Sequence, residues 1–169
     1  KCRKLYPDAE NGTSLWWLVQ ARNKKSVTAN LKHPDGLAVV KRLIAQADIV
    51  VENFRPSVLD KLGPGWNELS SLNPGLVMVR LSGFGQTGPM AQQPGFGAIG
   101  ESMGGLRFVT GFPDRPPVKT GVSIGDGIAS LWGAIGALMA LRHREVNGGT
   151  GQVVDVALYE AVFAMMESL

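Results

Sequence analysis

Residues 48–82 read DIVVENFRPSVLDKLGPGWNELSSLNPGLVMVRLS, and the pattern of this segment indicates the fold class. Apolar runs at 48–53 and 76–82 predict two short strands, the first of them buried. The segments 56–62 and 66–72 predict two helices, because each is followed by helix-ending residues, glycine, proline and asparagine among them. A strand, intervening helices and a second strand predict a parallel sheet with helices on its faces.

The same alternation continues on both sides of this stretch. Upstream, residues 26–31 predict a strand, and a proline followed by an aspartate predicts the start of a helix over 34–44. Downstream, small apolar residues from 123 to 144 predict a long buried helix, and residues 151–157 predict a strand that leads into an apolar helix. The predicted fold class is therefore α/β, with a parallel sheet and flanking helices.

Charge is spread unevenly over the 169 residues, which carry a formal net charge of +3. Residues 1–61 hold 11 Lys and Arg against 6 Asp and Glu, whereas residues 62–169 hold 6 against 8. The excess in the first third suits an anionic small ligand, although lysines on solvated helices would give the same count. It is too sparse for the basic face of a nucleic-acid-binding protein, so no nucleic-acid partner is expected.

The apolar stretches are interrupted by glycine or charge before they reach the roughly 18 residues of a membrane span, so no membrane partner is expected. Cys2 is the one cysteine and cannot form an internal disulfide, which favours a cytoplasmic location. A polar entry at 1–13 and an apolar, uncapped end at Leu169 indicate a piece of a longer protein.

Asp126 is the strongest candidate for a reactive carboxylate. It lies between two glycines before an apolar helix, and glycines let a ligand approach the backbone closely. The same position suits a helix N-cap, so the residues alone leave a structural and a functional role open. The glycine-rich segment 83–88 is interpreted as a loop over a site, and His33 and His143 as structural residues. No group of His, Cys, Asp and Glu has metal-ligand spacing.

Seven motifs run in order along nearly the whole chain: NKKSV (23–27), LKHPDG (31–36), ADIVVENFRP (47–56), LNP (72–74), LSGFGQTGP (81–89), GD (125–126) and GGTGQVVDV (148–156). Together they resemble the family III CoA-transferases, the group that includes formyl-CoA transferase and carnitine CoA-transferase. One such motif would be weak, but the order and spacing of all of them are specific.

The resemblance implies a Rossmann-like α/β domain and a smaller domain, with two subunits interlocked like links of a chain. Residues 1–169 would then be part of the large domain, with the first strand upstream and the small domain downstream. The resemblance also implies a homodimer for the full-length protein. An isolated chain of this length is expected to be inactive, because part of the active site would be missing.

The resemblance assigns roles to individual residues as well. Asp126 matches the catalytic aspartate, and Phe96 occupies a substrate-pocket position. Lys61 matches a basic residue that faces phosphate, although lysine in place of arginine keeps the charge and loses the planar fork. The remaining CoA-binding positions are Ala29, Asn30, Leu31, Lys32, Asn53, Phe54 and Arg55.

The implied reaction is the transfer of coenzyme A from an acyl-CoA to a small carboxylic acid. The Asp126 carboxylate would attack the acyl-CoA carbonyl to give a mixed anhydride, and the released thiolate would then form an aspartyl-CoA thioester. No metal and no tightly bound cofactor are expected, because CoA enters as a substrate.

Two alternatives stay open. An α-methylacyl-CoA racemase on the same fold would need a histidine where this chain has Phe96, since phenylalanine cannot exchange a proton. A non-catalytic CoA-binding module would keep the binding residues without the reaction.

Overall fold

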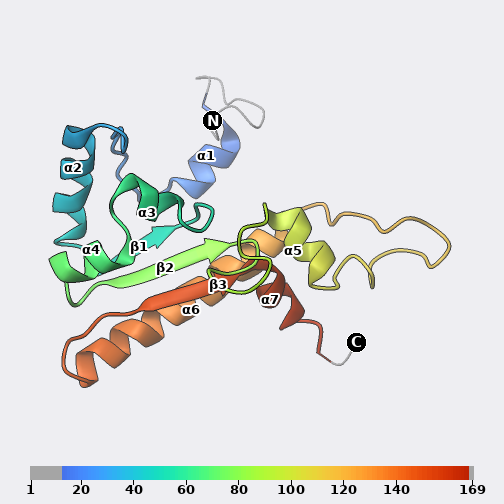
Figure 1. Ribbon diagram of the computed structural model, residues 1–169. Coiled ribbons are helices and arrows are strands. Elements are labelled where there is room, and N and C mark those ends of the chain that lie inside the picture. Colours follow the sequence, from blue (N-terminus) through green and yellow to red (C-terminus); the bar gives the residue numbers. More distant parts are fainter. Residues whose placement is uncertain (1–12, 168–169) are drawn as a thin grey trace.

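The computed structural model describes residues 13–167, which form a three-stranded sheet with helices packed around it (Figure 1). The longest helix, α6, runs along the sheet. The elements in chain order are α1 (Leu15–Gln20), α2 (Pro34–Ile44), β1 (Ile49–Glu52), α3 (Val58–Leu62), α4 (Trp66–Leu72), β2 (Val77–Ser82), α5 (Gly97–Met103), α6 (Ile124–Val146), β3 (Val153–Ala157) and α7 (Leu158–Phe163).

The sheet has the strand order β1–β2–β3, and both strand pairs are parallel. The register places Glu52 beside Arg80, and Arg80 beside Asp155. The chain passes from β2 to β3 through α5 and α6, and α6 lies against both strands. This arrangement confirms the parallel sheet with flanking helices that the pattern of residues 48–82 predicts.

Alternate residues of β2 point to opposite faces of the sheet and build two separate cores. Val77 and Val79 pack with small residues of α6, among them Ala129 and Ala137. On the other face, Met78 packs with buried residues from α2, α3 and α4, which are Ile44, Leu59 and Leu69. β2 is therefore buried on both faces, as a central strand of a parallel sheet normally is.

The long helix α6 differs from the sequence expectation on its outer face. Leu131 and Leu138 are each 66% exposed, because the described residues cover only the side of α6 that faces the sheet. The stretch Ile124–Val146 is also long and apolar enough to cross a membrane, with a mean hydropathy of 1.5 in its most apolar window. This result rests on length and composition alone, and glycine and charge still interrupt the helix at 125–127; α6 packs against β2 and β3 along one side.

Two expectations about strands also need correction. Residues 26–31 form no strand, because Asn30 begins a local turn in which its Oδ1 accepts a hydrogen bond from the Lys32 N–H at 3.0 Å. β1 is not fully buried, since Val51 is 65% exposed. In the described part of the chain β1 lies at an edge of the sheet, which leaves its outer side without a neighbouring strand.

Candidate active site

A cavity of about 640 Å³ opens at the carboxyl ends of β1 and β2. Ligands bind at this edge of parallel α/β sheets, where the loops leave the strands. The residues that follow β1, Asn53–Arg55, contribute to its lining. Phe96 lines it from the start of α5 and Asp126 from the first turn of α6. The structure therefore brings together residues from three separate parts of the chain that the sequence analysis singled out.

The other predicted CoA-binding residues do not belong to this lining. Ala29, Asn30, Leu31 and Lys32 lie in the segment before α2, and Lys61 is an exposed residue of α3. Of the predicted CoA-binding set, the cavity takes in Asn53–Arg55. The role of all these residues toward CoA, Asn53–Arg55 included, stays a prediction.

The Asp126 carboxylate lies against the start of α5. A Cβ built on Gly97 would lie 2.6 Å from Asp126 Oδ2, so the carboxylate fits there because residue 97 has no side chain. The helix begins at Ile124, and its N-cap residue is Ser123. The structural alternative from the sequence, in which Asp126 caps α6, is therefore wrong: Asp126 is already inside the first turn.

Burial and charge both act on the Asp126 carboxyl group. Partial burial is the largest cause that raises its pKa above the ordinary value of 3.8; the nearby Glu101 carboxylate raises it further, and Lys119 lowers it. Glu101 is 1% exposed, and its Oε2 lies 3.4 Å from Nε of Arg107. A carboxyl group with a raised pKa inside a cavity is typical of a functional site.

Replacement of Glu101 with glutamine should lower the pKa of Asp126. The change removes a negative charge that disfavours ionised Asp126, and it keeps an amide of similar size in the same space. If ionised Asp126 performs the chemistry, the acidic limb of kcat/KM should move to lower pH in the full-length protein. A pH–rate profile of both proteins measures the shift, and an acidic limb that stays in place would contradict the electrostatic coupling.

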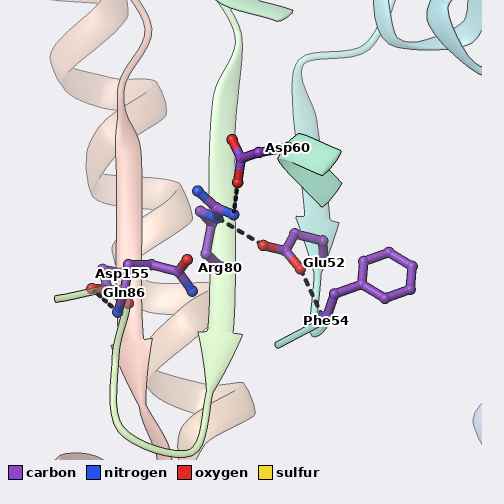
Figure 2. A network of polar contacts seen from close by, with 6 residues as sticks. All are labelled: Glu52, Phe54, Asp60, Arg80, Gln86 and Asp155. Carbon is purple, nitrogen blue, oxygen red and sulfur yellow. Dashed lines mark hydrogen bonds and ion pairs between the residues drawn. The ribbon is translucent and has the colours of Figure 1, made fainter. Parts of the chain in front are cut away.

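A buried network of charged side chains lies beside the segment that follows β1 (Figure 2). Arg80 Nε donates a hydrogen bond to Glu52 Oε1 at 2.7 Å, and Arg80 Nη2 donates to Asp60 Oδ2 at 3.1 Å. The other oxygen of Glu52, Oε2, accepts a hydrogen bond from the Phe54 N–H at 2.7 Å. The network therefore ties the wall of the cavity to β2 and to α3.

A second set of contacts orders the glycine-rich loop after β2. Asp155 Oδ2 accepts a hydrogen bond from the Gln86 N–H at 2.8 Å (Figure 2). Gly83 and Gly95 lie so close together that a Cβ on either one would collide with the backbone of the other. Both glycines line the cavity, and Gly83 is the residue of the segment 83–88 that does so; the role of that segment as a loop over a site stays a prediction.

The positions of the two histidines and of the other candidate metal ligands can be compared with the sequence interpretation. Among residues 13–167, no group of three or more His, Cys, Asp or Glu is placed to hold a metal ion. His33 is the N-cap of α2, where its Nδ1 accepts a hydrogen bond from the Asp35 N–H at 3.3 Å. His143 contacts the Asn147 side chain at the end of α6. The structure thus places both histidines at helix ends, and their purely structural role stays an interpretation.

The sequence analysis missed Arg80, Glu101 and Gly97, which lie outside the cavity lining and act on residues within it. Arg80 did give a signal, because a single charge inside an apolar strand needs a buried partner. Glu101 and Gly97 lie in a segment rich in glycine, where no periodicity marks a buried carboxylate or a close contact. Their importance depends on the packing of α5 against α6, which only the fold reveals.

The sequence and the fold both match a known family. The family model described as CoA-transferase family III matches residues 1–169, and the chain belongs to this family. The succinyl-CoA–D-citramalate CoA-transferase of Chloroflexus aurantiacus is 58% identical over 158 residues, which make up 94% of this chain and 39% of that relative. The succinyl-CoA–L-malate CoA-transferase beta subunit of the same organism is 47% identical over 168 residues, which make up 99% of this chain and 41% of that relative.

A solved structure confirms the fold class. The crystal structure of a CAIB/BAIF family protein from Brucella suis superposes with a TM-score of 0.91 at 36% sequence identity. The match covers 98% of this chain and 44% of that one. The chain thus spans about two fifths of the length of the relatives that it matches.

Proposed function

We propose that the full-length protein transfers coenzyme A from an acyl-CoA to a carboxylic acid, with Asp126 as the nucleophile. The observation that carries the proposal is the position of the Asp126 carboxylate. It shares one cavity, at the carboxyl ends of β1 and β2, with the segment Asn53–Arg55 that resembles a CoA-binding segment. Membership of CoA-transferase family III supports the class of reaction.

The proposed chemistry needs an ionised carboxylate that a thioester can reach. Asp126 attacks the acyl carbonyl, the C–S bond breaks, and CoA leaves as a thiolate, so that a mixed anhydride between Asp126 and the acyl group remains. The thiolate then attacks the aspartyl carbonyl, which releases the donor acid as its carboxylate and leaves an aspartyl-CoA thioester. The acceptor carboxylate attacks this thioester, and the same steps in reverse give the new acyl-CoA and free Asp126.

The named relatives indicate a class of acids for this reaction. Their names give succinyl-CoA as the donor and D-citramalate or L-malate as the acceptor, which are all compounds of dicarboxylic acids. We extend this class to the present chain, with a dicarboxylic acyl-CoA as donor and a short dicarboxylic acid as acceptor. Arg55 supplies a cation in the cavity lining, and Lys119 adds a second positive charge that acts on Asp126.

The proposal extends to the assembly of the protein. Residues 1–169 are taken as part of the large domain of a two-domain protein that forms an interlocked homodimer in the cytoplasm, with CoA as a substrate and no tightly bound cofactor. The partial coverage of the relatives, about 39–41%, supports a larger protein. Two relatives are named as alpha and beta subunits, so an assembly of two different chains is the competing arrangement.

Incubation of the full-length protein with succinyl-CoA and a panel of acids tests the proposed reaction. We expect new CoA esters of short dicarboxylic acids and far slower formation of monocarboxylic esters, measured by liquid chromatography and mass spectrometry. Tight binding of the CoA ester without any exchange would support a non-catalytic binding module instead. Absence of both binding and exchange would contradict the proposal.

The same protein in deuterated water separates the transferase from a racemase. Phe96 lines the cavity and is 62% exposed, and its ring has no group that could accept or donate a proton. A 2-methylacyl-CoA should therefore gain no deuterium at its α-carbon. Rapid uptake that depends on Asp126 would favour the racemase reaction.

A further inference from the structure

We propose that Glu52 is a positioning residue for the acyl-CoA: it is held by Arg80 and fixes the backbone of Phe54 at the wall of the cavity. This inference rests on the proposed function, because it assumes that the segment Asn53–Arg55 receives the CoA ester. It gives a functional role to the buried ion pair of Glu52 and Arg80, which takes no part in the proposed nucleophilic attack by Asp126.

Both carboxylate oxygens of Glu52 are occupied, and each one has a different partner. Oε1 accepts the Nε–H of Arg80 at 2.7 Å, and Oε2 accepts the backbone N–H of Phe54 at 2.7 Å (Figure 2). The Glu52 side chain is 4% exposed and that of Arg80 is 10% exposed, so water competes little for either contact. The orientation of the peptide before Phe54 is therefore set by Glu52, and that of Glu52 by Arg80.

A buried pair of this kind is a poor explanation for stability alone. Removal of two charges from water costs free energy, and a buried ion pair often contributes no more than apolar residues of the same volume. Met78, two residues before Arg80 on the same face of β2, is fully buried in an apolar core. An apolar residue at position 80 would extend that core but would offer no hydrogen-bond donor to orient Glu52.

Arg80 has a second, more exposed partner. Its Nη2 donates to Asp60 Oδ2 at 3.1 Å, and Asp60 lies on α3 outside the cavity lining. The Asp60 side chain is 46% exposed, so its contact with Arg80 is weaker than that of Glu52. Asp60 therefore offers a matched control: it touches the same arginine, but it does not touch the cavity segment.

The Glu52→Gln variant breaks one link without a change of size. The two donors face different oxygens of Glu52, so a glutamine in the same pose presents its one acceptor oxygen to Arg80 or to Phe54 but not to both. Its NH₂ group would face another donor at the remaining site. The segment after β1 should consequently loosen while the fold around Asp126 stays in place.

We expect Glu52→Gln in the full-length protein to raise the KM for the acyl-CoA about tenfold and to leave kcat within about twofold. The variant weakens binding of the acyl-CoA but leaves the reacting groups in place. Hydrogen–deuterium exchange of the Phe54 amide should become faster in the same variant. Asp60→Asn should change neither the KM nor this exchange, although its thermal midpoint falls. A purely structural network would lower the thermal midpoint in both variants and leave the KM of both unchanged.

The failure of this inference can be told apart from failure of the proposed function. An unchanged KM in Glu52→Gln with faster exchange at Phe54 would overturn the positioning role and leave the transferase intact. A wild-type protein that neither binds nor exchanges CoA esters would overturn the proposed function, and this inference with it. If Glu52→Gln fails to fold, Arg80→Lys keeps both charges and removes the two-pronged donor, and the same rise in KM is expected.

Discussion

Asp126→Asn should lower the rate of CoA transfer by on the order of 10³-fold or more in the full-length protein, as the loss of a nucleophile does. Asparagine keeps the size and shape of the side chain but has no carboxylate to attack the thioester. The residue does not cap α6, whose N-cap is Ser123, so the variant retains the start of the helix. Steady-state rates of CoA exchange measure the loss.

The control for this variant is its stability. Partial burial, with Glu101 as the second cause, raises the pKa of Asp126 above 3.8, so the folded protein loses stability as the pH rises through that pKa and the carboxyl group ionises. Asp126→Asn should therefore unfold at an equal or higher temperature than the wild type at pH 7. Treatment of the wild type with an acyl-CoA and hydroxylamine should leave a hydroxamate on Asp126. A fully active Asn variant, or the absence of that adduct, would refute covalent catalysis.

Gly97→Ala should lower kcat about 10²-fold, because a displacement of the order of 1 Å at a reacting group costs about that much. The added Cβ would lie 2.6 Å from Asp126 Oδ2, and no real pair of atoms of this kind approaches so closely. The carboxylate is the far end of a side chain, so it would turn away at little cost to the fold. The thermal midpoint should change little, since alanine also favours the α5 helix over glycine.

Gly121→Ala provides the comparison for Gly97→Ala. A Cβ at residue 121 would meet no atom within 4 Å, and the residue is not part of the cavity lining. Its kcat and KM should equal those of the wild type. Equal activity in Gly97→Ala and the wild type would show that the carboxylate does not react from the position seen here.

The parts of the fold that follow from local pattern were predicted well. Residues 66–72 form α4 as the turn residues on either side indicate, and the strands β1 and β2 lie where the apolar runs place them. Residues 26–31 were misread because strand propensity counts only when a neighbouring strand is available to pair with. The exposed side of α6 was misread because an apolar composition does not reveal how many neighbours a helix has.

The residues of the candidate site could be predicted where their immediate neighbours in the sequence mark them. Asp126 stands out between two glycines, and Asn53–Arg55 directly follows a strand. The partners of these residues are separate in the sequence: Arg80 is 28 positions from Glu52, and Asp155 is 69 positions from Gln86. Such pairs depend on strand order and register, which the alternation of strands and helices does not specify.

The order of the strands along the chain has a consequence for the kinetics of folding. β1 and β2 are joined by the short helices α3 and α4, whereas Met78 of β2 pairs with Val153 of β3 only after the longer segment that holds α5 and α6. Contacts between distant residues form slowly, because a long loop must close before they contribute any stability. During synthesis the β1–β2 half emerges first, with its later neighbour still unmade. The cavity takes Asn53–Arg55 from this early part and Asp126 from α6, so a nascent chain lacks this cavity until α6 has packed against the sheet.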